Sequence, residues 1–347
     1  AHYSGAVRPK ISQLDEVAFT SPAAEFTALE SGSLTVGTVP ADDLGAVSTL
    51  KANGYHVYGL PVFGFSNIFF NFKETSNDDN NLFGQLYIRQ VLAHLTDEEA
   101  SIKSRGIFDN AAAPAYGPIP VVPKSPFAPG SAATADYPFS PKDARGLLKT
   151  HGWRVVRNGT TVCVRAGSGA LDCGKGIPKG TPIKFNLYCT TQDSTICAQQ
   201  ETFESNARQV GITISVIPKE FNTVLSDDDN VTAPSNDTRW SMITFGPGQD
   251  SGYPTTNGIF NSGGSYDFGS YSNSTATSDI EASVYGKASD AVTKEGAFLE
   301  RNLPGIFLPN PDAVIAWKST LSGPPASFAN LTQIELTPEY WHFTRKP

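Results

Sequence analysis

The chain has 347 residues and a formal net charge of −8, and 39 % of its residues are hydrophobic. A net negative charge without a continuous stripe of Lys and Arg argues against nucleic acid as a partner, and no run of about eighteen apolar residues is present to span a bilayer. Length and composition predict a globular protein with one large domain or two to three modest ones.

The first part of the chain, residues 11–60, predicts alternating strands and helices. LDEVAFT has the alternation of a strand, and SPAAEFTALESG predicts a helix that begins after Ser21 and ends at Gly32. SLTVGTV and YHVYGL are typical of strands on either side of a helix in ADDLGAVSTLKANG. The region therefore has βαβαβ patterning.

A second α/β region begins at about residue 66 with the strand SNIFFNF and the amphipathic helix LFGQLYIRQVLAHLT. After a proline-rich loop, SPKDARGLLKTHGW predicts a helix that begins after Ser140 and ends at Gly152. RVVRNGTTVCV then predicts a hairpin that turns at Asn158-Gly159.

The remaining elements continue this region. KFNLYC, STICAQQETFESNARQVG and ITISVIP predict a strand–helix–strand unit, and WSMITF predicts a further strand. A long helical run follows at 278–302, before the strands GIFLPN and AVIAWK. This order of elements favours an α/β fold.

Four cysteines, Cys163, Cys173, Cys189 and Cys197, could be zinc ligands, free thiols or disulfides. Zinc ligands usually come in pairs about two to four residues apart, whereas nine and seven residues separate these cysteines. A chain of this length can form a core without disulfides, so buried thiols remain an alternative. Disulfides are the favoured interpretation, and they imply export to an oxidising compartment.

The cysteines can pair in three ways. We expect Cys163–Cys173, which lies on or just beyond the hairpin, and Cys189–Cys197, which links the end of a strand to the first turn of the next helix. The N-terminal AHYSGAVRPK lacks the pattern of a signal peptide, so we expect that any export signal has been removed.

No motif for catalysis or metal binding stands out. The five histidines are scattered without HExxH spacing, and no G-x-S-x-G sequence is present. The aspartates at 227–229 could be acid/base groups or calcium ligands, but a solvated loop is the favoured interpretation. We therefore expect no catalytic residue, no metal, no cofactor and no enzyme activity.

One segment, residues 240–280, has the composition of a binding loop. The strand WSMITF ends in a glycine-rich turn that holds one carboxylate, Asp250. Loops at strand ends carry binding sites in α/β proteins, and aromatic walls that exclude water strengthen a single charge–charge contact. An ordinary surface loop is the alternative. The candidate ligand-binding residues are Trp240, Phe245, Gly246, Gly248, Asp250 and Tyr253.

Several motifs, in order along the chain, resemble those of the extracellular solute-binding proteins of family 5, the oligopeptide, dipeptide and nickel ABC-importer group, particularly its actinobacterial members. They are YSGAVRPKISQLDEVAF, ALESGSLTVGTVPADDL, NIFFNF with IRQVLAHLTD, YPFSPKDARGLLKTHGW, GGSYDFGSYSNSTATSDI and LPGIFLPNPDAVIAWKSTLSG. The helix motif YPFSPKDARGLLKTHGW is a fairly specific signature. The matches extend over almost the entire chain.

The resemblance implies an α/β, periplasmic-binding-protein-like fold of the type II, cluster C kind. Family members are longer, so we expect this chain to be the C-terminal portion of such a protein. Residues 1–65 and 320–347 would be part of domain I, and residues 66–319 would be domain III, a ligand-binding lobe.

The resemblance also implies a role for Asp250. Peptide binders of the family carry an acidic residue in "W.aDy.dP" that pairs with the α-amino group of the ligand, and Pro254 follows Asp250 at the matching spacing. The sequence departs from the motif, because Phe245 stands near the Trp position and Tyr253 replaces the second Asp. These departures leave recognition of a peptide amino terminus open.

The function that the resemblance implies is capture of a peptide or another small solute, such as a nickel complex, for an ABC permease in the membrane. The protein would be an extracellular monomer on the cell surface, anchored by lipid through an N-terminal segment absent from the sequence. A surface sensor or adhesin that reuses the fold is one alternative, because fold alone does not separate transport from sensing. A secreted hydrolase is a further alternative.

Overall fold

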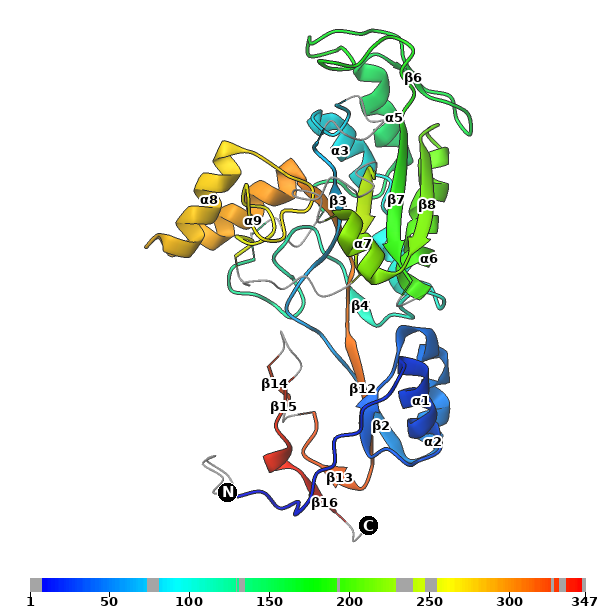
Figure 1. The fold of residues 1–347 in the computed structure, drawn as a ribbon, viewed down its shortest axis with the longest axis vertical. Coiled ribbons are helices and arrows are strands. Elements are labelled where there is room, and N and C mark those ends of the chain that lie inside the picture. The colour runs from blue at the N-terminus through cyan, green and yellow to red at the C-terminus, as the bar shows by residue number, and fades with distance from the viewer. Residues whose placement is uncertain are drawn as a thin grey trace.

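The computed structural model describes residues 8–73, 81–128, 130, 135–191, 194–228, 240–246, 255–325, 328–330 and 335–344. They form two lobes, each built on its own β-sheet, with the smaller lobe at one end of an elongated molecule (Figure 1). No helix within these ranges is long and apolar enough to cross a membrane.

The larger lobe is built on a mixed five-stranded sheet. Its strands are β3 (Ser66–Phe70), β7 (Lys184–Thr190), β8 (Thr213–Lys219), β9 (Met242–Thr244) and β10 (Gly305–Leu308). Their order is β10-β3-β9-β7-β8. β7 runs parallel to β8 and β9, whereas β3 is antiparallel to β9 and β10.

Helices cover both faces of this sheet. One face carries α3 (Leu86–Ala93), α5 (Pro141–Thr150) and α6 (Ser194–Arg208), and the other carries α7 (Phe221–Asp228), α8 (Ser274–Tyr285) and α9 (Ala291–Asn302). Because successive side chains of a strand point to opposite faces, Ile68 and Phe70 of β3 join the first core and Phe69 joins the second. The continuous apolar run of β3 is therefore that of a strand buried on both sides.

The smaller lobe has an antiparallel sheet of three strands, β1 (Val36–Thr38), β2 (Tyr55–Leu60) and β12 (Ala313–Lys318), with β12 in the centre. One face is covered by α1 (Pro22–Glu30), the 3-10 helix η1 (Ala41–Ala46) and α2 (Val47–Ala52). Leu29 and Leu50 are completely buried between these helices and the sheet.

The position of β12 differs from the domain division expected from the sequence. Residues 313–318 fall within the range 66–319 assigned to the larger domain, yet β12 pairs with both β1 and β2. The chain has therefore returned to the smaller lobe by residue 313.

Two predictions of secondary structure are wrong. LDEVAFT forms no strand, and its apolar side chains of Leu14 and Val17 are not buried, since they are 62 % and 55 % exposed. The run 278–302 is not one helix but parts of two, α8 and α9. The amide of Gly286 still donates to the carbonyl oxygen of Ala282 at 2.9 Å, but the extended backbone of Gly286 ends α8.

Short elements fill the connections. They are α4 (Glu98–Lys103), β4 (Ala112–Ala113), β5 (Trp153–Arg154), β6 (Val162–Cys163), β11 (Asn310–Pro311), β13 (Leu321–Ser322), β14 (Phe328–Asn330), β15 (Glu335–Leu336), η3 (Pro338–Tyr340) and β16 (His342–Phe343).

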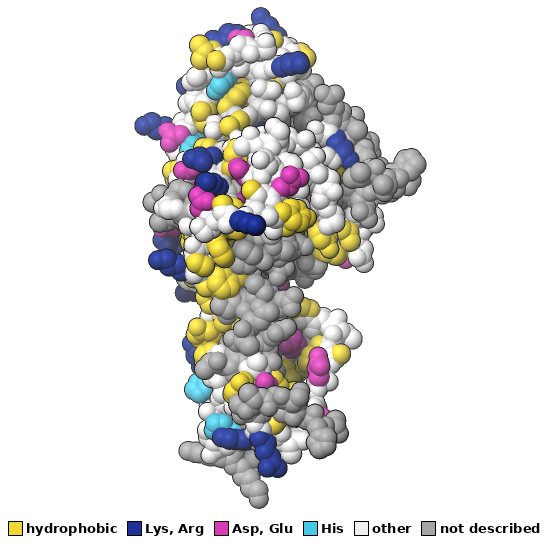
Figure 2. Space-filling model, turned by 90° about the vertical axis from the view of Figure 1, so that its left-hand side faces the viewer, with side chains coloured by type: hydrophobic (Ala, Val, Ile, Leu, Met, Phe, Trp, Pro, Cys, Tyr) yellow, Lys and Arg dark blue, Asp and Glu magenta, His cyan; other side chains and the backbone are white. Residues whose placement is uncertain are grey.

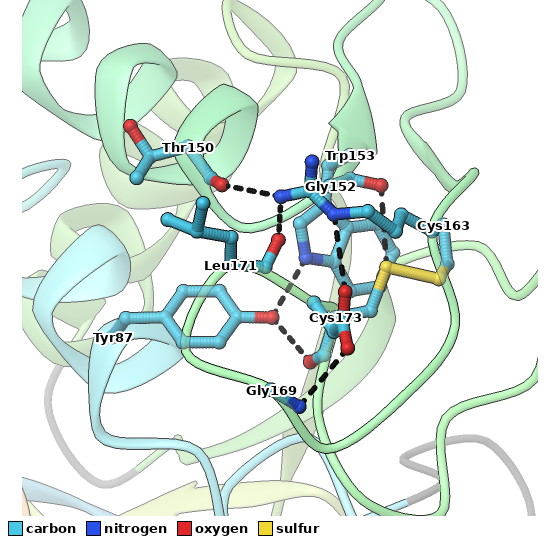
Figure 3. The surroundings of a disulfide bond; sticks show 10 residues. Tyr87, Thr150, Gly152, Trp153, Cys163, Gly169, Leu171 and Cys173 are labelled. Atoms are coloured by element: carbon cyan, nitrogen blue, oxygen red, sulfur yellow. Dashed lines mark hydrogen bonds and ion pairs between the residues drawn. A yellow bond between two sulfur atoms is a disulfide. The ribbon is translucent and has the colours of Figure 1, made fainter.

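The structure contains two disulfides, which join the cysteines in the expected local pairing. Cys163–Cys173 links β6 to the loop that follows it, and Cys189–Cys197 links the end of β7 to the first turn of α6. Figure 3 shows that the first bond lies beside Trp153 and Tyr87. The indole N–H of Trp153 donates to the Tyr87 hydroxyl at 2.7 Å, and that hydroxyl donates to the carbonyl oxygen of Cys173 at 2.5 Å.

Candidate functional site

Two neighbouring segments connect the lobes. Residues 61–65 lead from β2 to β3, and residues 309–312 lead from β10 to β12. The side-chain amide of Asn310 donates to the carbonyl oxygen of Val62 at 2.6 Å and so ties the two crossings together. Two short crossings side by side form the arrangement around which lobes can rotate as a hinge.

A cavity of about 150 Å³ lies beside these crossings and is lined from both lobes. The larger lobe contributes the residues just after β9, the first turns of α6 and the start of β3. This is the edge of the sheet at which α/β proteins commonly bind ligands. The lining residues are Ala41, Ser66, Phe108, Thr195, Ile196, Gln199, Thr244, Gly246, Leu308, Pro309, Pro311 and Asp312.

Gly246 forms the part of the wall that follows β9. Its φ of +97° lies in the region that favours glycine, and an added Cβ would come within 2.5 Å of the Ile196 side chain. A side chain at this position would therefore strain the backbone and press against α6.

Two buried polar atoms of the cavity wall have no hydrogen-bond partner among the described residues. They are the hydroxyl oxygen of Ser66 and the side-chain nitrogen of Gln199, on residues that are 3 % and 7 % exposed. The carbonyl oxygen of the Gln199 side chain accepts from Gln200 at 3.3 Å, so the amide group is held while its N–H groups stay unused. Because buried polar groups are rarely left unpaired, this pair of atoms marks a place for a polar ligand or for water.

The two lobes also meet through polar side chains. The hydroxyl of Ser194, at the start of α6, donates to a carboxylate oxygen of Asp42 in η1. Asp312 brings a carboxyl group to the cavity wall, and burial raises the pKa of this carboxyl above its usual value. The cavity thus combines hydroxyl, amide and carboxyl groups.

The structure brings only part of the predicted site together. Gly246 lines the cavity, whereas Trp240 and Phe245 are 3 % and 6 % exposed and belong to the aromatic core on the second face of the larger sheet. Phe245 packs there against Phe69 and Phe268. A ligand contact for these two aromatic side chains stays a prediction.

The other predicted ligand-binding residues, Gly248, Asp250 and Tyr253, lie outside the described residues. Sequence reasoning missed Ser66, Gln199 and Asp312, which lie in a predicted strand, in a predicted helix and between two predicted strands. No group of three or more His, Cys, Asp or Glu side chains that could hold a metal ion occurs among the residues that were placed.

A second, larger cavity of about 530 Å³ opens at the edge strand β10 of the larger lobe. Its wall includes the carboxylates of Asp97, Glu98 and Asp136 and the rings of Tyr116 and Tyr137. Loss of solvation raises the pKa of Glu98 to about 8, although the hydrogen bond from the Ala115 amide at 3.0 Å lowers it. This cavity is separate from the space between the lobes.

Known proteins share this architecture. The chain superposes on the oligopeptide-binding protein AppA of Bacillus subtilis, solved with a nonapeptide, with a TM-score of 0.68, 18 % identity and coverage of 94 % of this chain and 59 % of that chain. NikZ of Campylobacter jejuni, solved with Ni(L-His), gives a TM-score of 0.66, 17 % identity and coverage of 92 % and 60 %. The chain therefore spans about 60 % of the length of these proteins, whose likeness confirms the periplasmic-binding-protein-like α/β fold.

Comparisons of the amino-acid sequence point to the same group of proteins as the fold does. A Brucella ovis protein provisionally named an ABC transporter peptide-binding protein is 28 % identical over 160 residues, which cover 45 % of this chain and 27 % of that protein. The model of the family described as bacterial extracellular solute-binding proteins, family 5 Middle, matches residues 1–268. Because that match covers well over half of the residues of this chain, the chain belongs to the family 5 bacterial extracellular solute-binding proteins.

Proposed function

We propose that the chain is the C-terminal portion of the solute-binding component of an ABC importer, and that it captures a peptide or a similar small solute outside the cell. The observation that carries this proposal is the cavity between the lobes, with the unpartnered atoms of Ser66 and Gln199 in its wall. The printed names of the relatives, which refer to peptide and nickel binding, support it.

Capture requires no chemical reaction. The solute enters while the lobes are apart, its polar groups take up the hydrogen bonds that Ser66 and Gln199 lack, and the hinge formed by the two crossings closes over it. Closure removes water from the cavity, which strengthens each polar contact. A membrane permease then receives the solute from a monomeric binding protein held at the cell surface by a lipid anchor.

The proposed site is tested at Gln199. Its replacement in Gln199→Met keeps the length of the side chain but removes the carbonyl oxygen and the N–H groups of its amide. We expect at least tenfold weaker binding of short peptides, because polar ligand atoms would face an apolar wall. Native mass spectrometry identifies the peptides that are retained from a pool, and titration calorimetry measures their affinity. Gln209→Met is the matched control, since Gln209 follows the last turn of the same helix and lies outside the cavity. Equal affinities in the two variants would contradict the assignment.

Asp250 is proposed to offer a negative charge to a cationic group of the solute, as the acidic residue of the family motif does. Removing one partner of a desolvated ion pair costs about 2–5 kcal/mol, so Asp250→Asn should weaken binding of a peptide with a free amino terminus at least tenfold. N-acetylated peptide provides the control, because its affinity should not depend on Asp250. An unchanged affinity for the free peptide would remove Asp250 from the site.

A further inference from the structure

The segment 142–184 differs in charge from the rest of the chain. It contains nine Lys or Arg residues and two Asp residues, a formal net charge of +7, while the whole chain carries −8. The residues outside the segment therefore carry −15 together. The basic residues are spread along the sequence rather than consecutive, so their concentration becomes visible only where the fold gathers them.

The fold places this segment at the end of the molecule opposite the smaller lobe. It comprises α5, the hairpin of β5 and β6, the glycine-rich loop after the hairpin and the start of β7 (Figure 1). Lys and Arg side chains lie beside apolar ones on this end in the space-filling view (Figure 2). The exposed cations are Lys142, Lys149, Arg154, Arg157, Arg165, Lys175, Lys179 and Lys184.

Most of these cations have no acidic partner among the described residues. Within the part of the chain that the structure describes, the one ion pair in the segment joins Arg165 to Asp172 at 3.1 Å. Lys149, Arg154 and Lys179 form no ion pair with any described residue. Their charges face water and are available to an anionic surface.

Apolar side chains stand exposed among the cations. Val156, Val164 and Leu171 are 40 %, 41 % and 56 % exposed. The hairpin register explains the exposure of Arg154. Trp153 and Cys163 are directly opposite each other and both buried, so Arg154, the next residue of β5, points outward, and Val164, just after β6, is exposed as well.

The loop that carries part of this surface is held in place. The Cys163–Cys173 disulfide closes it, and the Arg165 guanidinium donates to the carbonyl oxygens of Thr150 at 2.9 Å and of Leu171 (Figure 3). The amide of Val164 donates to the carbonyl oxygen of Gly152 at 2.9 Å. The exposed side chains therefore project from a rigid support, which reduces the ordering cost of binding.

We propose that this end of the molecule docks on a membrane surface rich in anionic phospholipid. The apical patch is defined by Lys149, Arg154, Val156, Arg157, Val164, Leu171, Lys175 and Lys179. Its cations would contact lipid phosphates while its valines and leucine enter the boundary between headgroups and acyl chains, which is the combination that binds peripheral proteins to bilayers.

Composition favours lipid over two other anionic partners. Protein interfaces are depleted in Lys and enriched in aromatic anchors, whereas the segment is rich in exposed Lys and its one aromatic ring of Phe, Tyr or Trp type, Trp153, is buried. Single-stranded nucleic acid requires aromatic side chains for base stacking, and the patch exposes none. The proposal is independent of the identity of the solute bound between the lobes.

Vesicle binding of the full chain tests the proposal. Flotation with phosphatidylcholine vesicles, with and without phosphatidylglycerol, should show binding only to the anionic vesicles, and binding should weaken as salt is added. The triple variant Lys149→Glu, Arg154→Glu, Lys179→Glu should bind them about a hundredfold more weakly, because each cation near an anionic surface contributes about a factor of five. Leu171→Ser with Val164→Ser should weaken binding severalfold at unchanged charge.

A second triple variant distinguishes an effect of the apical patch from an effect of net charge alone. Lys51→Glu, Arg105→Glu and Lys287→Glu change the net charge equally, and all three residues are exposed and lie outside the segment. It should retain vesicle binding, and thermal unfolding should show that both triple variants fold. Equal losses in the two variants would overturn the proposal, as would equal binding to neutral vesicles. Complete competition by soluble polyglutamate at matched charge would assign the patch to an acidic protein and would also overturn it.

Discussion

Glu98 stands in the wall of the larger cavity with a carboxylate that has lost most of its water. Its pKa is raised from 4.5 to about 8, mainly by desolvation. Between these two values the folded protein holds a proton that the unfolded chain has released. By proton linkage, the free energy of unfolding must fall as the pH rises from about 4.5 to about 8, and Glu98 adds no further change above that.

Replacement of this carboxyl group should therefore change the pH profile of stability. We expect Glu98→Gln to remove the decline and to exceed the wild type in free energy of unfolding by about 2–4 kcal/mol above pH 8. Urea unfolding across this pH range measures the difference. Glu99→Gln is the control, because Glu99 is exposed and pairs with Lys103. Parallel profiles for Glu98→Gln and the wild type would contradict the prediction.

Single residues also show where the sequence was informative about the site. Gly246 could be predicted, since a glycine-rich turn directly after a strand is a local pattern. Ser66 and Gln199 could not, because they are single polar residues in a buried strand and in a long helix. Whether their polar atoms find hydrogen-bond partners depends on the neighbours that the tertiary structure places beside them. No local sequence pattern reveals those neighbours.

At the scale of elements, the Cys189–Cys197 disulfide is well placed to support the site. It joins the end of β7 to α6, and Ile196 and Gln199 next to Cys197 line the cavity between the lobes. The other disulfide closes a loop of similar length on the hairpin, with a sequence separation of 10 against 8. The two disulfides therefore differ much more in location than in the length of the loop that each closes.

The double variant Cys189→Ser, Cys197→Ser should lose stability and affinity together. Chain entropy gives each small loop about 2.5 kcal/mol of unfolding free energy, and a loosened α6 would no longer hold Gln199 at the cavity. Cys163→Ser with Cys173→Ser should lose similar stability but keep the affinity for the solute. Guanidinium unfolding and calorimetry measure the two quantities, and equal loss of affinity in both variants would count against the argument.

Most elements of the larger lobe could be predicted from sequence, and the reason is visible in α5. Ser140 accepts a hydrogen bond from the amide of Asp143, and Pro141 begins the helix, so its start is encoded locally. The failure at residues 14–20 has a tertiary cause. Alternation of apolar and polar residues creates a strand only where one side is buried, and the side chains of Leu14 and Val17 stay exposed.

For the whole molecule, the contact between Ser194 and Asp42 tests the idea that the lobes close over a solute. It joins η1 of the smaller lobe to α6 of the larger one. Asp42→Ala should weaken solute binding about threefold, since a hydrogen bond at an exposed position contributes little. Small-angle scattering should show a larger mean radius of gyration. Asp43→Ala, next in the chain, is the control and should change neither quantity.

The central strand of the smaller lobe has a consequence for how the protein is made. β1 and β2 are complete by residue 60 but do not pair with each other, because β12, at residues 313–318, lies between them. During synthesis, the segment that carries β1 and β2 therefore cannot close this sheet until residues 313–318 have also been made. The larger lobe, whose five-stranded sheet lies between residues 66 and 308, can form first, and β12 then pairs with β1 and β2. Completion of the smaller sheet is in this way a late event, which waits for a strand that is distant in the sequence.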